Sequence, residues 1–322
     1  MKHIENKIAA IIIWYNPNNI GEKKIVSNIN SYSKYFSKIY IIDNSKVSNK
    51  ELSDKITKCK YIQNYNIGGI AGAQNRGCDA ALRDGFEWAM TLDQDSYFQP
   101  EQIKKYIDKF NEYAQKDTSI KSFSLKIKQN TKTTSIIKLI QFNILSPIKR
   151  KLLGKHWHPK NNNKNKEVIE FPNEVIASGN IISLEAWSQV NKFDEYLFID
   201  EVDHDFCHKL IGQNYKIIRF NDVYLEHFLG EKTISLFVKS FGSYNNFRLY
   251  YIYRNILIER FRYPEFIDFY NERLKKILFD TLINSIHPIS HFYIFIKAYY
   301  DYKKYKSMQK EFDKLTNFPK TS

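Results

Sequence analysis

The sequence predicts an α/β protein with a mostly parallel sheet flanked by helices and a helical extension at its C-terminal end. Short apolar runs alternate with segments of helical periodicity over residues 8–95, which is the pattern of βαβ units. Each run ends in a polar loop, and beyond Gly230 the pattern becomes long, helical and rich in aromatic residues. We therefore expect a parallel sheet first and helices last.

The predicted strands are short and apolar. Residues 8–14 form a continuous apolar run, which is typical of a central strand buried on both faces. Further strands are expected at 39–42, 61–63 and 86–92, and the double glycine at 68–69 opens a helix of small residues. Apolar character returns later in the chain at 175–182, 217–220 and 223–225.

The 322 residues can bury one large core or two smaller ones. We expect an α/β domain over residues 1–230 with a basic insertion at about 130–170, and a helical, aromatic and basic region over 231–322. The net charge of +14 suggests an anionic partner. Residues 121–170 contain twelve Lys or Arg against two Asp or Glu, and residues 231–322 contain sixteen against nine. The remainder is slightly acidic, which disfavours a nucleic-acid-binding protein.

Cysteine usage and hydropathy favour the cytoplasm. Cys59, Cys78 and Cys207 are far apart and odd in number, so neither a disulfide framework nor a zinc site is expected. The N-terminus lacks the long apolar run of a signal peptide, and no window reaches eighteen uncharged apolar residues.

The first chemical motif is Asp93-Gln94-Asp95, directly after the predicted strand 86–92. Two carboxylates this close repel unless a cation lies between them, and oxygen ligands suit Mg²⁺ and Mn²⁺. Such an ion would in turn hold phosphates. The alternative is an acidic turn that caps the helix after Pro100.

Polar residues follow each of the first four predicted strands. Because ligands of parallel sheets bind at the carboxyl ends of the strands, a site is expected along this edge. The residues concerned are Asn16, Asp43, Asn66 and Asp93.

In their order along the chain, these motifs resemble family 2 glycosyltransferases, which have the GT-A fold, and in particular the bacterial rhamnosyltransferase branch. The matching segments are 14–17, 43–45, 66–77, 93–95, 178–180, 198–207, His227 and 250–255. The resemblance implies inverting transfer of L-rhamnose from dTDP-L-rhamnose in the synthesis of a bacterial surface polysaccharide. UDP-galactofuranose and UDP-hexoses are the alternative donors. The implied acceptor is a glycan or a polyprenyl-diphosphate-linked oligosaccharide.

The resemblance also implies roles for single residues. Asp95 would bind Mg²⁺ or Mn²⁺, with Asp93 beside it at the ribose and His227 as a further ligand of the metal or the diphosphate. The glycines would let the backbone approach the nucleotide closely. Contacts with the nucleotide sugar are expected from Tyr15, Asn16, Asp43, Asn66, Gly68, Gly69, Asn75, Arg76, Asp93, Gln94 and Arg254. Residues expected on the acceptor side are Ser178, Gly179, Asn180 and Trp187.

An inverting transfer needs a general base for the acceptor hydroxyl. The resemblance places this base at Asp203, but the glutamate that precedes it in the family is Val202 here, which leaves Asp200 and Asp205 as alternatives. Favourable charge at a helix N-terminus is a structural explanation for one or two of these carboxylates.

The aromatic and basic residues of 231–322 suit a membrane interface, so we expect a peripheral protein on the inner face of the plasma membrane. An aromatic helical core or a homodimer interface is the alternative.

Three other functions compete with the transferase. A haloacid-dehalogenase-like phosphatase carries its D-x-D on the first strand, whereas here the motif follows the fourth predicted strand. A nucleic-acid-binding module is disfavoured because no nucleic-acid-binding motif occurs in the sequence. A non-catalytic homologue conflicts with the presence of Asp93, Asp95 and Asp203.

Overall fold

The computed structural model describes residues 7–19, 21–129, 168–227, 245–283 and 287–316. The chain divides into two compact units. The first unit comprises residues 1–131, 165–198 and 202–233, and the second, helical unit comprises 132–164, 199–201 and 234–322. No sequence pattern indicated that residues 199–201 group with the helical unit. The expected basic insertion lies almost entirely outside the described residues.

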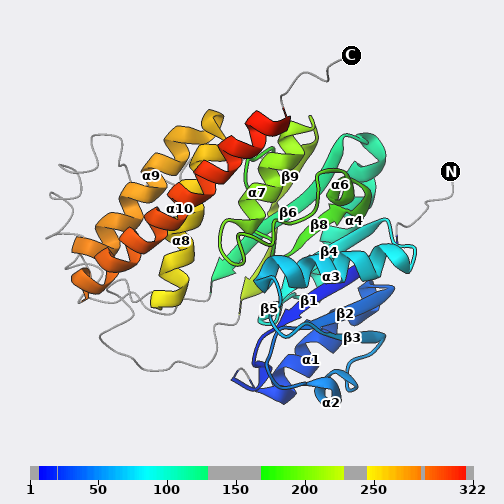
Figure 1. Ribbon diagram of the computed structural model, residues 1–322. Helices are drawn as coiled ribbons and strands as arrows, with labels where there is room; N and C mark the ends of the chain where they lie inside the picture. Colours follow the sequence, from blue (N-terminus) through cyan, green and yellow to red (C-terminus); the bar gives the residue numbers. More distant parts are fainter. Residues whose placement is uncertain (1–6, 20, 130–167, 228–244, 284–286, 317–322) are drawn as a thin grey trace, which may run out of the picture. The chain divides into compact units, whose positions relative to one another are not determined.

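The first unit is built on a nine-stranded mixed sheet in the order β3-β2-β1-β4-β8-β6-β9-β5, with β7 beside β9 (Figure 1). The strands are β1 (Ile8–Trp14), β2 (Lys38–Asp43), β3 (Cys59–Gln63), β4 (Trp88–Asp93), β5 (Ser96–Tyr97), β6 (Ile120–Gln129), β7 (Ile169–Glu170), β8 (Asn180–Ser183) and β9 (Lys216–His227).

Helices cover both faces of this sheet. They are α1 (Glu22–Tyr32), α2 (Lys50–Ser53), α3 (Gly69–Arg83), α4 (Pro100–Lys116), α6 (Leu184–Gln189) and α7 (Val202–Gly212), with short 3₁₀ turns η1 (Pro17–Asn19) and η2 (Ser33–Tyr35). Helices α1 and α4 pack on the face that carries Ile8, Ala10 and Ile12. Helix α3 packs on the opposite face, where a Cβ on Gly77 would lie 2.3 Å from Cγ2 of Ile11. Small residues on α3 therefore allow a close helix–sheet contact.

Strands β1 to β4 are parallel, as the sequence predicts. In the ladders Trp14 lies opposite Asp43, and Asp43 lies opposite Gln63. Asp93 lies opposite Ile13 in the neighbouring ladder. The loops that follow these four strands consequently meet at one edge of the sheet.

The second half of the sheet differs from the predicted strands in two places. The apolar run 175–182 is extended only from Asn180, because Gly179 has a φ of +78° that interrupts an extended backbone. The runs 217–220 and 223–225 belong to one strand, β9, whose pairing with β6 shifts register between Leu125 and Lys126. Strand β8 is antiparallel to β4, so residues 175–179 lie beside the carboxyl end of β4.

The helical unit contains three helices that lie side by side (Figure 1). They are α8 (Asn246–Arg262), α9 (Ile267–Leu278) and α10 (Pro288–Thr316), with the short turns η3 (Pro264–Phe266) and η4 (Phe279–Ile283). Leu249 and Tyr253 of α8 pack on Ala298 of α10, and Ile252 and Ile256 of α8 pack on α9. Among the residues described, no helix is both long and apolar enough to cross a membrane.

Candidate functional site

The D-x-D motif forms the turn between β4 and β5. Asp93 ends β4, and its backbone N–H donates to Oγ of Ser96 at 3.0 Å. Helix α4 begins at Pro100 with Gln99 as its N-cap, so the alternative in which this turn caps a helix is wrong. Between the two carboxylates, Gln94 accepts from the backbone N–H of Tyr15 at 2.9 Å and donates to its carbonyl at 3.1 Å. The turn is thereby joined to the loop after β1.

His227 reaches the same turn from the end of β9. Strand β5 pairs antiparallel with β9 in a register that sets Ser96 opposite His227. Asp93, Asp95 and His227 each offer one ligand atom, and these three atoms lie within 4.8 Å of one another. Carboxylate oxygens suit Mg²⁺ and Mn²⁺, and imidazole nitrogen is a common additional ligand.

Buried hydroxyl groups support this cluster. Oγ of Ser178 lies 2.9 Å from Nε2 of His227 and 2.9 Å from Oγ of Ser96. Burial raises the pKa of Asp93, and the neighbouring charges of Asp95 and Asp203 raise it further, whereas His227 and a hydrogen bond to Ser178 lower it. The two carboxylates and one imidazole of this cluster fit a divalent cation, because the ion compensates the repulsion between the acids.

Asp203 is the member of the 200–205 acidic cluster that lies toward this site. It occupies the first turn of α7, and its Oδ2 accepts from the backbone N–H of Ala177 at 3.3 Å. Its Oδ1 accepts from the N–H of His204 at 3.1 Å. The side chain is half-buried, and its charge reaches Asp93.

Both alternative bases are engaged elsewhere. The carboxylate of Asp205 is fully buried and forms an ion pair with Lys209 at 2.7 Å. Asp200 belongs to the helical unit, where Nη2 and Nε of Arg248 donate to its two oxygens at 2.8 and 3.0 Å. The carboxylates of Asp200 and Asp205 are thus each paired with a cationic side chain.

The carboxylate of Asp43 is bonded to the loop after β2. We expected this carboxylate to contact the nucleotide, but it is fully buried. Its Oδ1 accepts from the N–H of Ser45, and its Oδ2 accepts from the hydroxyl of Tyr61 and from both nitrogens of Asn49, at 2.7 to 3.1 Å. Asp43 thus shapes the loop after β2. At the same edge, Tyr15 remains 56% exposed, and Asn16 has a φ of +48° and is exposed.

The glycines before α3 lie close to residues 195–198 of the protein. Gly69 has a φ of +63°, and a Cβ there would lie 2.3 Å from the carbonyl oxygen of Phe198. A Cβ on Gly68 would lie 2.6 Å from Oε2 of Glu195. The close approach that glycine permits is therefore to residues 195–198 of the protein. Asn66 has a φ of +58° and remains half-buried.

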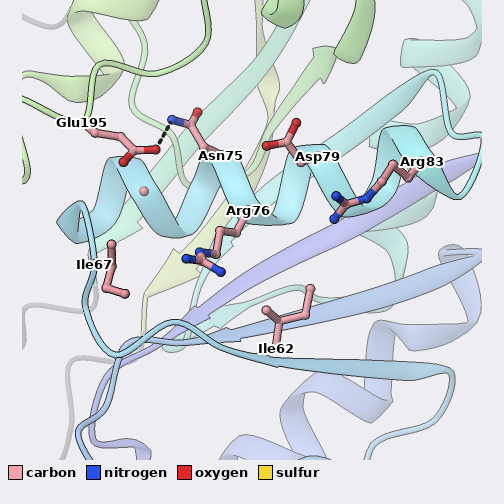
Figure 2. A pocket seen from close by; sticks show the side chains of 8 residues that line it. Ile62, Ile67, Asn75, Arg76, Asp79, Arg83 and Glu195 are labelled. Atoms are coloured by element: carbon pink, nitrogen blue, oxygen red, sulfur yellow. Dashed lines mark hydrogen bonds between the residues drawn. The ribbon is translucent and has the colours of Figure 1, made fainter.

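Asn75, which we expected to contact the nucleotide sugar, is 5% exposed and is bonded within the protein. Its amide donates to the carbonyl of Phe193 and to Glu195, both at 2.9 Å, and accepts from the N–H of Phe193 and from Nε1 of Trp187. Figure 2 shows the bond to Glu195, and it shows Arg76 beside a hollow of about 330 Å³ at the side of α3. Arg76 itself is exposed.

The expected acceptor-side residues are mostly inaccessible. Trp187 is fully buried in the core, and Asn180 is 4% exposed, with its Oδ1 bonded to Oγ of Ser122 at 2.8 Å. The N–H of Gly179 donates to the carbonyl of Thr91. These three residues are packed or bonded within the protein, and their assignment to the acceptor side stays a prediction. Ser178 is equally buried and contacts His227 instead.

Arg254 lies in the helical unit and is 7% exposed. Its guanidinium lies 4.7 Å from the ring centroid of Tyr251, and Nε donates to Oδ1 of Asn255 at 3.0 Å. Sequence reasoning missed Ser96, whose only signal was its place directly after the D-x-D turn. It also gave no role to the side chain of Asn255.

Comparisons with known proteins identify the family of this chain. The model of the family described as "Glycosyl transferase family 2" matches residues 10–182. The chain is 26% identical over 272 residues to the dTDP-rhamnosyl transferase RfbF of Shigella flexneri, a match that covers 79% of this chain and 80% of that protein.

Two solved structures share the fold. One is S. aureus TarS 1-349 in complex with UDP-GlcNAc, with a TM-score of 0.54, 17% identity, and coverage of 92% of this chain and 80% of that one. The other is GalNAc-T7 with UDP, GalNAc and Mn²⁺, with a TM-score of 0.50 and 12% identity. That match covers 71% of this chain and only 45% of GalNAc-T7. These likenesses confirm the predicted GT-A fold. Because the family model covers more than half of the chain and includes the D-x-D turn, the chain belongs to glycosyl transferase family 2 and is a glycosyltransferase.

Proposed function

We propose that this glycosyltransferase moves L-rhamnose from dTDP-L-rhamnose onto a glycan acceptor with inversion, using a divalent cation. The observation that carries the proposal is the meeting of Asp93, Asp95 and His227, with Asp203 nearby, at the carboxyl end of β4. The choice of donor rests on the similarity to a dTDP-rhamnosyl transferase over 79% of the chain.

In the donor half of the site, different side chains contact the cation, the ribose and the nucleobase. Asp95 and His227 would hold the cation, and Asp93 would contact the ribose beside it. When bound, the cation stabilises the negative charge on the leaving diphosphate. The exposed Tyr15 and Asn16 form a platform for the nucleobase of the donor. Gln94 fixes this platform to the D-x-D turn through two hydrogen bonds with the backbone of Tyr15.

Asp203 supplies the base. It takes the proton of the acceptor hydroxyl as that oxygen attacks the anomeric carbon and the bond from this carbon to the phosphate oxygen breaks. The N–H groups of Ala177 and His204 hold the Asp203 carboxylate in place. Asp203→Asn should lower transfer by at least about a hundredfold and leave donor binding unchanged. Retained transfer, with loss in Asp200→Asn, would move the base to Asp200.

A donor screen by thermal shift tests the proposal as a whole. The protein is heated with Mn²⁺ and dTDP-L-rhamnose, UDP-galactofuranose, UDP-glucose or UDP-GlcNAc, each with and without EDTA. At a hundredfold excess over its Kd, the true donor stabilises the folded state by about 2.7 kcal/mol. Stabilisation by a UDP-sugar alone would reject the rhamnosyl donor. Unchanged stabilisation and turnover in EDTA would reject the metal.

The acceptor is proposed from helix α10. Six apolar side chains recur along one face of this helix with exposed fractions of 42 to 72%. They are Ile289, Phe292, Tyr293, Ile296, Tyr299 and Tyr300. On the same face, one to three turns later, lie Lys303, Lys304 and Lys310. Aromatic and aliphatic side chains next to lysines suit an anionic bilayer surface. We therefore propose a lipid-linked acceptor, such as a polyprenyl-diphosphate glycan, at the inner face of the plasma membrane; a homodimer through this face is the alternative.

A further inference from the structure

The chain that leads into Asp203 has an unusual backbone. Phe198, Asp200 and Glu201 have φ values of +67°, +61° and +63°, so three of four consecutive residues are left-handed. A left-handed φ is uncommon for non-glycine residues, and for a Phe or a Glu it needs support from the surroundings. Asp203 follows two residues later, at the start of α7. Something must therefore hold residues 198–201 in this path.

Side chains of helices α8 and α9 bind residues 199–201. Nδ2 of Asn255, which is fully buried, donates to the carbonyls of Ile199 and Asp200 at 2.8 and 2.9 Å. Arg248 forms its two-pronged contact with the carboxylate of Asp200. Arg273 of α9 lies 2.7 Å from Oε1 of Glu201, whose side chain is fully buried. All three residues 199–201 are thus bound by side chains of the helical unit.

The other end of this segment is fixed in the first unit. The carbonyl of Phe198 accepts from the N–H of Ile70 at 2.8 Å, at the start of α3. Gly69 lies close to the same carbonyl oxygen, and a Cβ on Gly69 would lie 2.3 Å from it. Phe198 is thus held within the first unit, and residues 199–201 are held within the helical unit.

Glu201 is a costly residue to bury, because its carboxylate loses its hydration, whereas the side chain of Arg273 stays 36% exposed. An apolar residue at 201 would pack without that cost, whereas a Glu–Arg pair is satisfied in one geometry only. The burial of Glu201 against Arg273 is therefore better explained by the conformation that it fixes than by the stability that it adds.

We propose that Asn255, Arg273 and Glu201 are positioning residues that set the N-terminus of α7, and with it the Asp203 carboxylate, for the transfer step. This inference rests on the proposed function, in which Asp203 is the base. The side chains of the helical unit then act on the reaction through the continuous chain 199–203. Removing the contacts that Asn255 and Arg273 make with residues 199–201 should lower kcat and leave the affinity for the donor unchanged.

The experiment compares Arg273→Ala, Asn255→Ala and Glu201→Gln with the wild type. Transfer from dTDP-L-rhamnose is measured for kcat and donor KM, and the affinity for dTDP with Mn²⁺ is measured by calorimetry. We expect kcat to fall at least tenfold in each variant, while donor KM and dTDP affinity stay within twofold. Arg273→Lys, which keeps the charge, should recover part of kcat. The matched control is Lys275→Ala, which removes an exposed ion pair with Glu272 on the same helix and should leave kcat unchanged.

Two outcomes overturn the inference. Wild-type kcat in Arg273→Ala, whatever its melting temperature, would show that the pair only stabilises the fold. A parallel fall of kcat and dTDP affinity in the folded variants would show a general loss of structure. If Arg273→Ala does not fold, the near-isosteric Glu201→Gln decides by the same two criteria. Failure of the proposed function is recognised separately, because wild type would then transfer no rhamnose or Asp203→Asn would remain active.

Discussion

The carboxyl group of Asp93 shows how single residues determine the chemistry of the site. Its pKa is raised chiefly by burial, and also by Asp95 and Asp203. A carboxyl whose pKa is higher in the folded than in the unfolded state holds its proton longer when folded, so ionising it near neutral pH costs stability. A bound cation removes that cost because it favours the ionised form. The folded protein should therefore be stabilised by the metal alone.

Asp95→Asn tests this expectation. In wild type, Mn²⁺ at a hundredfold excess over its Kd should stabilise the protein by about 2.7 kcal/mol, measured as a rise in melting temperature without nucleotide. Asp95→Asn should abolish most of that rise because it replaces a charged ligand with a neutral one. Asp108→Asn is the control, since this exposed acid on α4 pairs only with Lys104 among the described residues. An equal Mn²⁺ response in wild type and Asp95→Asn would remove Asp95 from the metal site.

Asn75 contributes to stability, because its side-chain amide forms hydrogen bonds with Phe193, Glu195 and Trp187 of the protein. Replacing it with alanine leaves the N–H and carbonyl of Phe193 and the indole N–H of Trp187 without their partner. Unpaired buried groups are expensive, so we expect Asn75→Ala to lower the free energy of unfolding by about 2–4 kcal/mol in urea titrations. The exposed Gln189→Ala should change it by less than about 0.5 kcal/mol. A near-neutral Asn75→Ala would mean that the 187–195 segment is held by other contacts.

Among the elements, those defined by local pattern were predictable, and those defined by long-range pairing were not. Strands β1, β2, β3 and β4 follow from continuous apolar runs, and their loops meet because parallel strands end at one edge. Strand β8 begins at Asn180 and not at residue 175, because Gly179 has a left-handed φ. The apolar composition of the run 175–182 does not reveal this φ. Motif residues were found, but their roles were harder to infer: Asp43 and Asn75 are polar in the sequence, yet only the fold shows that their partners are within the protein.

The start of α3 offers a test at this scale. Gly69→Ala would place a methyl group 2.3 Å from the carbonyl oxygen of Phe198 at a φ of +63°. A backbone atom cannot move aside cheaply, so we expect a loss of about 3 kcal/mol or more, measured by urea unfolding. Gly85→Ala has a φ of +83° with open space around it, and should cost only about 1–2 kcal/mol. Equal losses in the two variants would show that the contact with Phe198 contributes nothing beyond backbone strain.

At the scale of the whole molecule, sequence and structure divide the chain differently. A boundary at residue 230 follows from composition, but residues 199–201 belong with helices that begin more than forty residues later. That grouping depends on Asn255 and Arg273 finding partners far away in sequence, which no local pattern encodes. Likewise, the aromatic residues of 231–322 could be counted from the sequence, but only the fold distinguishes the two faces of α10.

Helix α10 packs Ala298, Ile294 and Phe295 toward α8 and leaves the opposite, aromatic face exposed. If that face binds an anionic bilayer, Phe292→Ser should weaken partitioning into phosphatidylglycerol vesicles by about tenfold, since burying such a side chain contributes about 1.5 kcal/mol or more. Phe171→Ser, the same change at a residue that is 61% exposed in the first unit, should have no effect. Because the lysines on this face add an electrostatic contribution, binding should also fall with salt and be weak on neutral vesicles. Salt-independent self-association that Phe292→Ser abolishes, without vesicle binding, would instead identify the face as a dimer interface.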